Sequence, residues 1–325
     1  MKTILISGGG GYLGTQLSQH LLKKHKVIIY DKFYFPWILN NKKKVKNNHN
    51  LSFIKKNISN AKLNDFKNVD IVCDLNGISN DPSSELNPKH TWKLNYNDRV
   101  NFAKLAKKAK VKRYIFNSTC SVYGFSKKKV LENGLKKPIS TYAKANLKSE
   151  NFIYKLRDKN FKVNSLRNST LFGFSNSMRL DLVINIFVLN IIKKKGIIID
   201  GDGNQFRPFI SVNDVCKIYD ILISKTQLPS FICNIVSFNS KIRNIAYKIC
   251  NVLNVNQKIV KFKKNFSDKR NYNVGSKNFK KYFGNNFKFS KFDFEIKNLK
   301  NNLKKFKLNY SKNTIRMKFY KDILK

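Results

Sequence analysis

The chain has 325 residues, of which 42% are hydrophobic, and a formal net charge of +46. This length and apolar content exclude a disordered chain and suffice for one large α/β domain with an appended lobe, or for two modest domains. The charge could mark a surface for nucleic acid, or a general enrichment in Lys, Asn and Ile, whose codons are A/T-rich. The second interpretation is favoured, because Lys is spread along the whole chain and greatly outnumbers Arg, the better phosphate ligand. We therefore expect no specific nucleic-acid partner.

The five cysteines and four histidines are scattered, and they form no CxxC, HxxxH or HxH pattern. A metal site and a disulfide framework are therefore not expected, and a reducing cytoplasm fits. The N-terminal MKTILISGGGG lacks the apolar region and cleavage site of a signal peptide. The longest apolar run, at 182–192, is too short to cross a membrane and contains two asparagines, so we expect no membrane span.

Taken in chain order, the first half alternates short apolar segments with segments of helical spacing. The expected strands are 3–6, 26–30, 51–54, 70–75 and 113–117, and the expected helices include 15–25 and 95–111. Such alternation predicts βαβ units, and hence an α/β fold with a Rossmann-like, doubly wound parallel sheet. We expect this domain to span residues 1–170.

The pattern is less regular after about residue 170, and we expect a smaller C-terminal lobe at 171–325, with part of 205–240 returning to the first domain. Helices are expected near 180–195, 212–224 and 240–253, and strands near 197–199 and 231–236. The Lys-rich tail at 261–325 carries regular aromatic residues and is expected to pack as small helices. The basic, Asn-rich segment 32–50 is expected to be a surface excursion.

A glycine-rich turn, SGGGGYLG at 7–14, directly follows the first expected strand. Gly8, Gly11 and Gly14 have the spacing at which glycines allow a tight turn, close approach to a pyrophosphate and close helix packing. The following helix directs its positive end at the phosphates. Asp31 ends the second strand, where a carboxylate accepts from both ribose hydroxyls of NAD and repels the 2′-phosphate of NADP. The sequence therefore predicts NAD, bound by this turn, including Tyr12 and Leu13, and by Asp31.

Further motifs follow in a fixed order. They are NSTCSVYG at 117–124, STYAKAN at 140–146, SLRNSTLFG at 165–173, GDGNQFRPFISVNDV at 201–215 and DKRNYNVGSKNF at 268–279. With these motifs the chain resembles, over nearly its whole length, the extended short-chain dehydrogenase/reductase family. More narrowly, it resembles the NAD-dependent nucleotide-sugar epimerases and dehydratases. The resemblance implies a substrate-binding C-terminal lobe, a homodimer formed through two helices including 140–159, and a role in carbohydrate metabolism such as cell-surface polysaccharide biosynthesis.

The resemblance also implies roles for individual residues. Thr119 would hydrogen-bond the reacting sugar oxygen, and Tyr142 would be the acid–base residue. Arg207 and Arg270 would hold the substrate diphosphate, for which forked, charged donors are suited. Arg179 would face either substrate or solvent. The remaining expected contacts are Asn57, Ile58, Leu75, Asn76, Gly77 and Asn117 with the cofactor, and Ser79 and Asn80 with the sugar.

The residues after Thr119 bear on the type of reaction. Dehydratases of this family carry Asp and Glu there, because elimination of water needs an extra acid and base. This chain has Cys120 and Ser121, and neither replaces a carboxylate at neutral pH, since a thiol has a reference pKa of about 8.5. C4 epimerisation of a UDP- or similar nucleotide-hexose through a 4-keto intermediate is therefore the leading hypothesis. A nucleotide-sugar ketoreductase, a dehydratase and a non-catalytic NAD-binding sensor remain alternatives.

Asn146 departs from the family, in which a lysine stands four residues after the tyrosine. An ammonium about 4 Å away, at an effective dielectric near 20, would favour the tyrosinate by roughly 4 kcal/mol, or about three pK units. Asn146 cannot supply that charge, although its amide can donate to the nicotinamide ribose. Lys144 and Lys148 are expected to point away from Tyr142. A lysine from elsewhere in the chain, or the positive charge of the nicotinamide, could take the place of that ammonium. If neither does, Tyr142 lacks activation, and Asn146→Lys should raise activity near pH 7.

Overall fold

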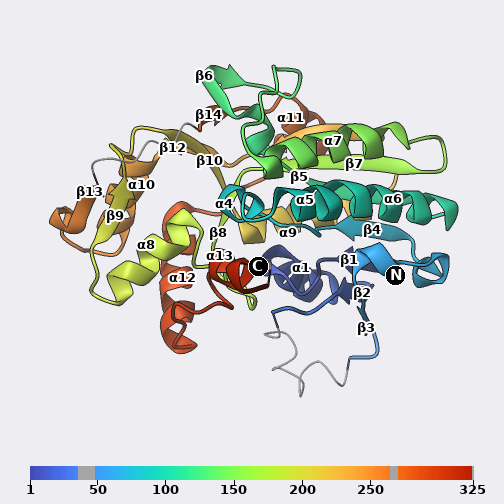
Figure 1. Ribbon diagram of the computed structural model, residues 1–325, viewed down its shortest axis with the longest axis horizontal. Helices are drawn as coiled ribbons and strands as arrows, with labels where there is room; N and C mark the ends of the chain where they lie inside the picture. Colours follow the sequence, from blue (N-terminus) through green and yellow to red (C-terminus); the bar gives the residue numbers. More distant parts are fainter. Residues whose placement is uncertain (36–47, 264–269, 324–325) are drawn as a thin grey trace.

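A computed structural model describes residues 1–35, 48–263 and 270–323 (Figure 1). Its centre is a seven-stranded sheet with the order β11-β7-β5-β4-β1-β2-β3, in which every neighbouring pair is parallel. The strands are β1 (Thr3–Ser7), β2 (Lys26–Asp31), β3 (Leu51–Lys55), β4 (Ile71–Asp74), β5 (Arg113–Thr119), β7 (Lys162–Asn168) and β11 (Phe231–Ile235). The predicted Rossmann-like, doubly wound fold is confirmed. The strand order reverses between β1 and β4, and ligands of such sheets bind beside the carboxyl ends of the strands at that point.

Helices cover both faces of the sheet, and the alternation of side chains along β1 divides the core between them. Ile4 packs into one apolar cluster with helices α1 (Tyr12–Leu21) and α9 (Val212–Ser224). Leu5, the next residue, packs into the other cluster with α6 (Arg99–Lys108) and α7 (Thr141–Lys155). Short helical segments precede α6, namely η1 (Ile58–Asn60), η2 (Leu63–Phe66), α4 (Asp81–Ser84), α5 (Pro88–Trp92) and the π-helix η3 (Lys93–Asp98).

The C-terminal half adds three small sheets beside the carboxyl end of the large one. Their strands are β8 (Thr170–Phe172), β10 (Phe206–Ser211) and β12 (Phe238–Lys241); β9 (Ile197–Asp200) and β13 (Val260–Lys263); and β6 (Phe125–Val130) and β14 (Asn271–Val274). The helices are α8 (Val183–Ile192), α10 (Ile242–Val252), α11 (Asn278–Phe283), α12 (Phe292–Lys305) and α13 (Arg316–Ile323). In Figure 1, β9, β13, α8 and α10 form the lobe at the left.

The chain crosses back to the large sheet after β10. Helix α9 packs against α1, and β11 pairs with β7 at the edge of the sheet. The expected helices of this half are α8, α9 and α10, and the expected strands are β9 and β11. The tail contains helices, as expected, but also the strands β13 and β14. Most of the expected surface excursion, residues 36–47, lies outside the described residues. Within the described ranges, no helix is both long enough and apolar enough to cross a membrane.

Candidate active site

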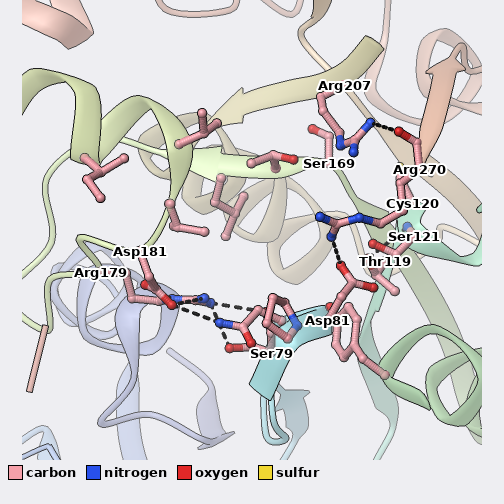
Figure 2. A pocket seen from close by; sticks show the side chains of 18 of the residues that line it. Ser79, Asp81, Thr119, Cys120, Ser121, Ser169, Arg179, Asp181, Arg207 and Arg270 are labelled. Carbon is pink, nitrogen blue, oxygen red and sulfur yellow. Dashed lines mark hydrogen bonds and ion pairs between the residues drawn. The ribbon is translucent and has the colours of Figure 1, made fainter. Parts of the chain in front are cut away.

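A cleft of about 620 Å³ lies where the carboxyl ends of the central strands face the C-terminal lobe (Figure 2). It brings together side chains that are far apart in the sequence. The predicted site residues that line it are Tyr12, Ser79, Asn80, Asn117, Thr119, Tyr142, Arg179, Arg207 and Arg270. The glycines of the turn, Asp31, Asn57, Ile58, Leu75, Asn76, Gly77 and Asn146 are not part of this lining.

The glycine turn between β1 and α1 fits a dinucleotide. Gly8 has a φ of +71°, and a Cβ there would lie 2.9 Å from the Leu75 carbonyl group. A Cβ on Gly14 would lie 2.5 Å from the Gly8 carbonyl oxygen, so the helix can approach the turn only with glycine at this position. Gly11 begins α1 without any capping side chain, and the first N–H groups of that helix are the kind that bind a pyrophosphate.

Asp31 lies beside this turn, at the end of β2. Its carboxylate accepts hydrogen bonds from the backbone N–H groups of Gly10, at 3.0 Å, and Phe33, at 2.6 Å. Burial raises the pKa of Asp31, while these two bonds and the nearby Arg316 guanidinium act in the opposite direction. Arg316 is the first residue of α13, so the C-terminal helix brings a positive charge near the predicted ribose ligand.

The other positions expected to contact the cofactor make local contacts in the structure. The Asn57 side chain caps η1, and Ile58 is buried in the apolar cluster beside α6. Leu75 is partly buried, and the Asn76 side chain accepts from the Gly77 N–H at 2.8 Å. Gly77 has a φ of +130°, and a Cβ there would lie 2.8 Å from Asn95 Oδ1. Cofactor contact at these positions stays a prediction.

Tyr142 and Thr119 meet at the floor of the cleft. Tyr142 is in the first turn of α7, which begins at the Ser140 cap, and Thr119 is the last residue of β5. Burial raises the pKa of Tyr142 to about 12; the nearby Thr119 hydroxyl acts against this rise, Asp81 adds to it, and Arg179 and Arg99 oppose it. The arrangement is a tyrosine with a hydroxyl partner, and proton transfer is the chemistry it can perform.

Arg179 lines the cleft and is buried, and its contact with substrate stays a prediction. Only 6% of its surface is exposed. Its guanidinium contacts Asp181 at 2.9 Å and donates to Ser79 Oγ at 2.8 Å (Figure 2). Asn80 donates to the same aspartate at 2.9 Å and also caps α4. Ser79, Asn80 and Arg179 therefore form one polar cluster around Asp181.

Arg207 and Arg270 lie together on the opposite wall of the cleft. Arg207 Nη1 donates to the backbone carbonyl of Arg270 at 2.5 Å, and its guanidinium lies 5.2 Å from the Tyr272 ring centroid. Arg270 in turn contacts the carboxylate of Asp81 at 2.5 Å (Figure 2). Two arginines thus lie together in the cleft lining, and one of them, Arg270, forms an ion pair with a carboxylate.

Asn146 is directed into the interior of the protein. It is 2% exposed, its Oδ1 accepts from Arg99 Nη1 at 2.9 Å, and its Nδ2 donates to the Tyr142 carbonyl at 2.8 Å. Lys144 is exposed, and the Lys148 ammonium lies 4.7 Å from the Tyr96 ring centroid, so both point away from Tyr142 as expected. A donation from Asn146 to a cofactor ribose stays a prediction.

Sequence reasoning missed five charged residues of this region: Asp74, Asp81, Arg99, Asp181 and Asp200. Asp81, Asp181 and Asp200 line the cleft, and Asp74 and Arg99 form a buried ion pair behind it. The sequence does contain a signal for the buried ion pair of Asp74 and Arg99. Asp74 ends an apolar strand segment and Arg99 adjoins the apolar face of a helix, and buried charges of this kind need partners.

Comparisons with known proteins agree with this geometry. A family model described as the NAD dependent epimerase/dehydratase family matches residues 4–235. An uncharacterized UDP-glucose epimerase, YtcB of Bacillus subtilis, is 29% identical over 241 residues, which cover 71% of this chain and 76% of that protein. The dTDP-D-glucose 4,6-dehydratase of Homo sapiens is 25% identical over 243 residues, covering 72% of this chain and 69% of that protein.

Solved structures show the same fold. The UDP-N-acetylglucosamine 4-epimerase from Methanobrevibacter ruminantium M1, in complex with UDP-N-acetylmuramic acid, has a TM-score of 0.81 and 24% identity, covering 94% of this chain and 98% of that one. The dTDP-glucose 4,6-dehydratase DesIV of Streptomyces venezuelae, with NAD and TYD bound, has a TM-score of 0.80 and 19% identity, covering 93% of this chain and 98% of that one.

Proposed function

The chain belongs to the NAD dependent epimerase/dehydratase family, and from its cleft we propose that it interconverts the C4 epimers of a nucleotide-activated hexose, most simply a UDP-hexose. The observation that carries this proposal is the presence of Tyr142 and Thr119 together in the cleft lining, with no carboxylate at the two positions after Thr119. The Cys120 thiol is buried and donates to the Arg167 carbonyl at 3.1 Å, and the Ser121 hydroxyl lies 3.3 Å from that of Tyr272.

The family's cofactor is NAD, and the residues present fit it. The glycine turn and the uncapped start of α1 would hold its pyrophosphate, and Asp31 would hold a ribose. When bound, NAD supplies the acceptor and later the donor of a hydride. The proposed tasks of the protein's own side chains are proton transfer, orientation of the sugar and retention of the diphosphate.

In the proposed reaction, Tyr142 accepts the proton of the sugar C4 hydroxyl, and Thr119 hydrogen-bonds the same oxygen. Oxidation at C4 gives a ketone, which turns over in the cleft and is reduced on its other face, while Tyr142 returns the proton. Arg207 and Arg270 hold the diphosphate, so that only the sugar moves. Arg270 would exchange its contact with Asp81 for a contact with the diphosphate.

Dehydration is the second candidate, because the cleft does contain carboxylates. Asp81, Asp181 and Asp200 line it. However, Asp81 is bound by Arg270 and Asp181 by Arg179, and Asp200 is an exposed residue of β9. None of these three carboxylates stands after Thr119, where the dehydratases of the resemblance carry their acid and base. Epimerisation needs neither this acid nor this base, and it is therefore the preferred reaction.

The proposal is tested with purified, NAD-loaded protein and a panel of UDP-glucose, UDP-N-acetylglucosamine and UDP-glucuronic acid, followed by NMR. The expected result is the C4 epimer of at least one sugar without net cofactor consumption, and no product with Tyr142→Phe. A product lighter by one water would indicate a dehydratase, and stoichiometric use of reduced cofactor a ketoreductase. Saturable NAD binding without any conversion over a wider sugar panel would favour a sensor and contradict the proposal.

A further inference from the structure

A buried guanidinium lies behind the catalytic tyrosine. Arg99, the first residue of α6, is 2% exposed, and its guanidinium stacks 3.9 Å from the Phe116 ring centroid. Four of its five N–H groups have acceptors: Nε binds Asp74 Oδ2 at 2.8 Å, Nη2 binds the carbonyls of Asp74 and Asn117, each at 3.1 Å, and Nη1 binds Asn146 Oδ1 at 2.9 Å. The remaining hydrogen is on Nη1, the nitrogen that faces α7.

The ion pair of Asp74 and Arg99 is oriented with its positive member toward α7. Asp74 contacts Nε, whereas Asn146 contacts Nη1, so the positive member lies between the carboxylate and α7. The Asp74 carboxylate also accepts from the hydroxyls of Ser7 and Tyr114, each at 2.9 Å, and from the Asn76 N–H at 3.2 Å. Its charge is thus shared among donors from β1, from β5 and from the loop after β4. The end of this network that reaches α7 is cationic.

The identity of residue 146 follows from this arrangement. Asn146 links the guanidinium to the backbone of Tyr142, because it accepts from Arg99 and donates to the Tyr142 carbonyl. A lysine at this position would place its ammonium against the guanidinium in a buried site, and like charges there are strongly unfavourable. A neutral side chain with an acceptor oxygen is the compatible choice. Arg99 and Asn146 therefore form one unit.

We propose that Arg99 is a positioning residue that supplies, from α6, a buried positive charge favouring ionisation of Tyr142, with Asn146 as the neutral link between them. The inference rests on the proposed function in that Tyr142 is taken as the base. Other groups face the tyrosine from neighbouring elements: Thr119 from β5, Asp81 from α4 and Arg179 from the loop before α8. Asp81 opposes ionisation of the tyrosine, whereas Arg99 and Arg179 promote it. A guanidinium stays charged at every working pH, so its effect would not titrate.

The test measures the pKa of Tyr142 directly, from tyrosinate absorbance of each NAD-loaded protein after subtraction of its Tyr142→Phe counterpart. Arg99→Met should raise this pKa by about one unit, the order expected for a charge at this range at an effective dielectric near 20. Asn146→Lys alone should lower the midpoint of thermal unfolding and give no gain in activity near pH 7, because two cations then meet. The double variant Arg99→Met/Asn146→Lys should return the Tyr142 pKa to the wild-type value or below.

An unchanged Tyr142 pKa in Arg99→Met would overturn the inference, as would a double variant with a pKa as high as that of Arg99→Met. If Arg99→Met does not fold, Asp74→Asn takes its place: removal of the counter-charge should lower the Tyr142 pKa, and an unchanged or raised value would contradict the proposal. The titrations of Tyr142 and the thermal unfolding need no turnover. Absence of epimerisation would therefore sink the proposed function, whereas the titrations decide the role of Arg99.

Discussion

Thr119 and Tyr142 are the residues on which the proposed chemistry depends most directly. The pKa of Tyr142 is about 12, so the basic form is scarce near pH 7 and the rate should increase as pH rises through the neutral and alkaline range. Thr119→Val removes the hydroxyl that lowers this pKa. Since hydrogen bonds to charged groups contribute about 1.5–3 kcal/mol, we expect kcat near pH 7 to fall about 10- to 100-fold. The measurement is kcat against pH.

Thr119→Ser is the matched control, because it keeps the hydroxyl and loses only a methyl group. It should keep the wild-type pH profile to within a few tenths of a unit, while Thr119→Val moves the alkaline limb to higher pH. Equal losses in both variants, with unshifted profiles, would show that the site needs the threonine's shape and not its hydrogen bond.

The same residues show what a sequence can reveal about a site. Tyr142 and Thr119 could be proposed because each stands in a short contiguous motif. Arg99 and Asp74 stand in no such motif, and their role arises from contacts between β4, α6 and α7 that no single segment contains. Asn146 was recognised as a departure, but its explanation lies 47 positions away along the chain, at Arg99.

At the scale of elements, α7 is anchored to β7 by a second buried ion pair. Glu150 and Arg167 are 0% and 2% exposed, their charged groups are 2.6 Å apart, and Arg167 also donates to the Tyr123 hydroxyl at 2.7 Å. Glu150→Gln leaves the guanidinium without its counter-charge, and we expect the free energy of unfolding to fall by about 3–5 kcal/mol in urea titrations. The double variant Glu150→Leu/Arg167→Met, which removes both charges, should lose less. A larger loss in the double variant would show that the pair is net stabilising.

This polar anchoring also explains why β7 was not predicted as a strand. Its residues are nearly all buried, yet they include Asn164, Ser165 and Arg167, so the sequence lacks an apolar run. Partners elsewhere satisfy them, such as Arg113 for Asn164 and Glu150 for Ser165 and Arg167. Strands with apolar side chains, such as β1 and β4, could be predicted because hydrophobic burial is visible locally. The strands β13 and β14 could not, because each has only four residues, of which half are polar.

At the scale of the whole molecule, lysine and arginine differ in where they contribute positive charge. Lysines predominate along the chain, but the cations lining the cleft, among the described residues, are Arg179, Arg207 and Arg270. Arginine offers the forked donors that match a diphosphate, whereas dispersed lysines provide only a general field. The selective part of anion binding is therefore expected in the cleft, and the general part should weaken as salt rises.

The contact between Asp81 and Arg270 joins the two halves of the molecule across this cleft, since Asp81 begins α4 and Arg270 precedes β14 (Figure 2). If Arg270 binds the substrate diphosphate as proposed, Asp81 competes with the diphosphate for the same guanidinium. Asp81→Asn should therefore bind UDP several-fold more tightly, while Arg270→Met should bind it about 10- to 100-fold more weakly, as the loss of a charge-assisted hydrogen bond implies. Calorimetric titration with UDP at low and high salt measures both.

Arg157→Met, which removes an exposed charge just beyond the C-terminal end of α7, is the control and should change UDP affinity by less than about twofold at high salt. If Arg157→Met and Arg270→Met weaken binding equally, the effect belongs to the overall charge, and Arg270 does not hold the diphosphate.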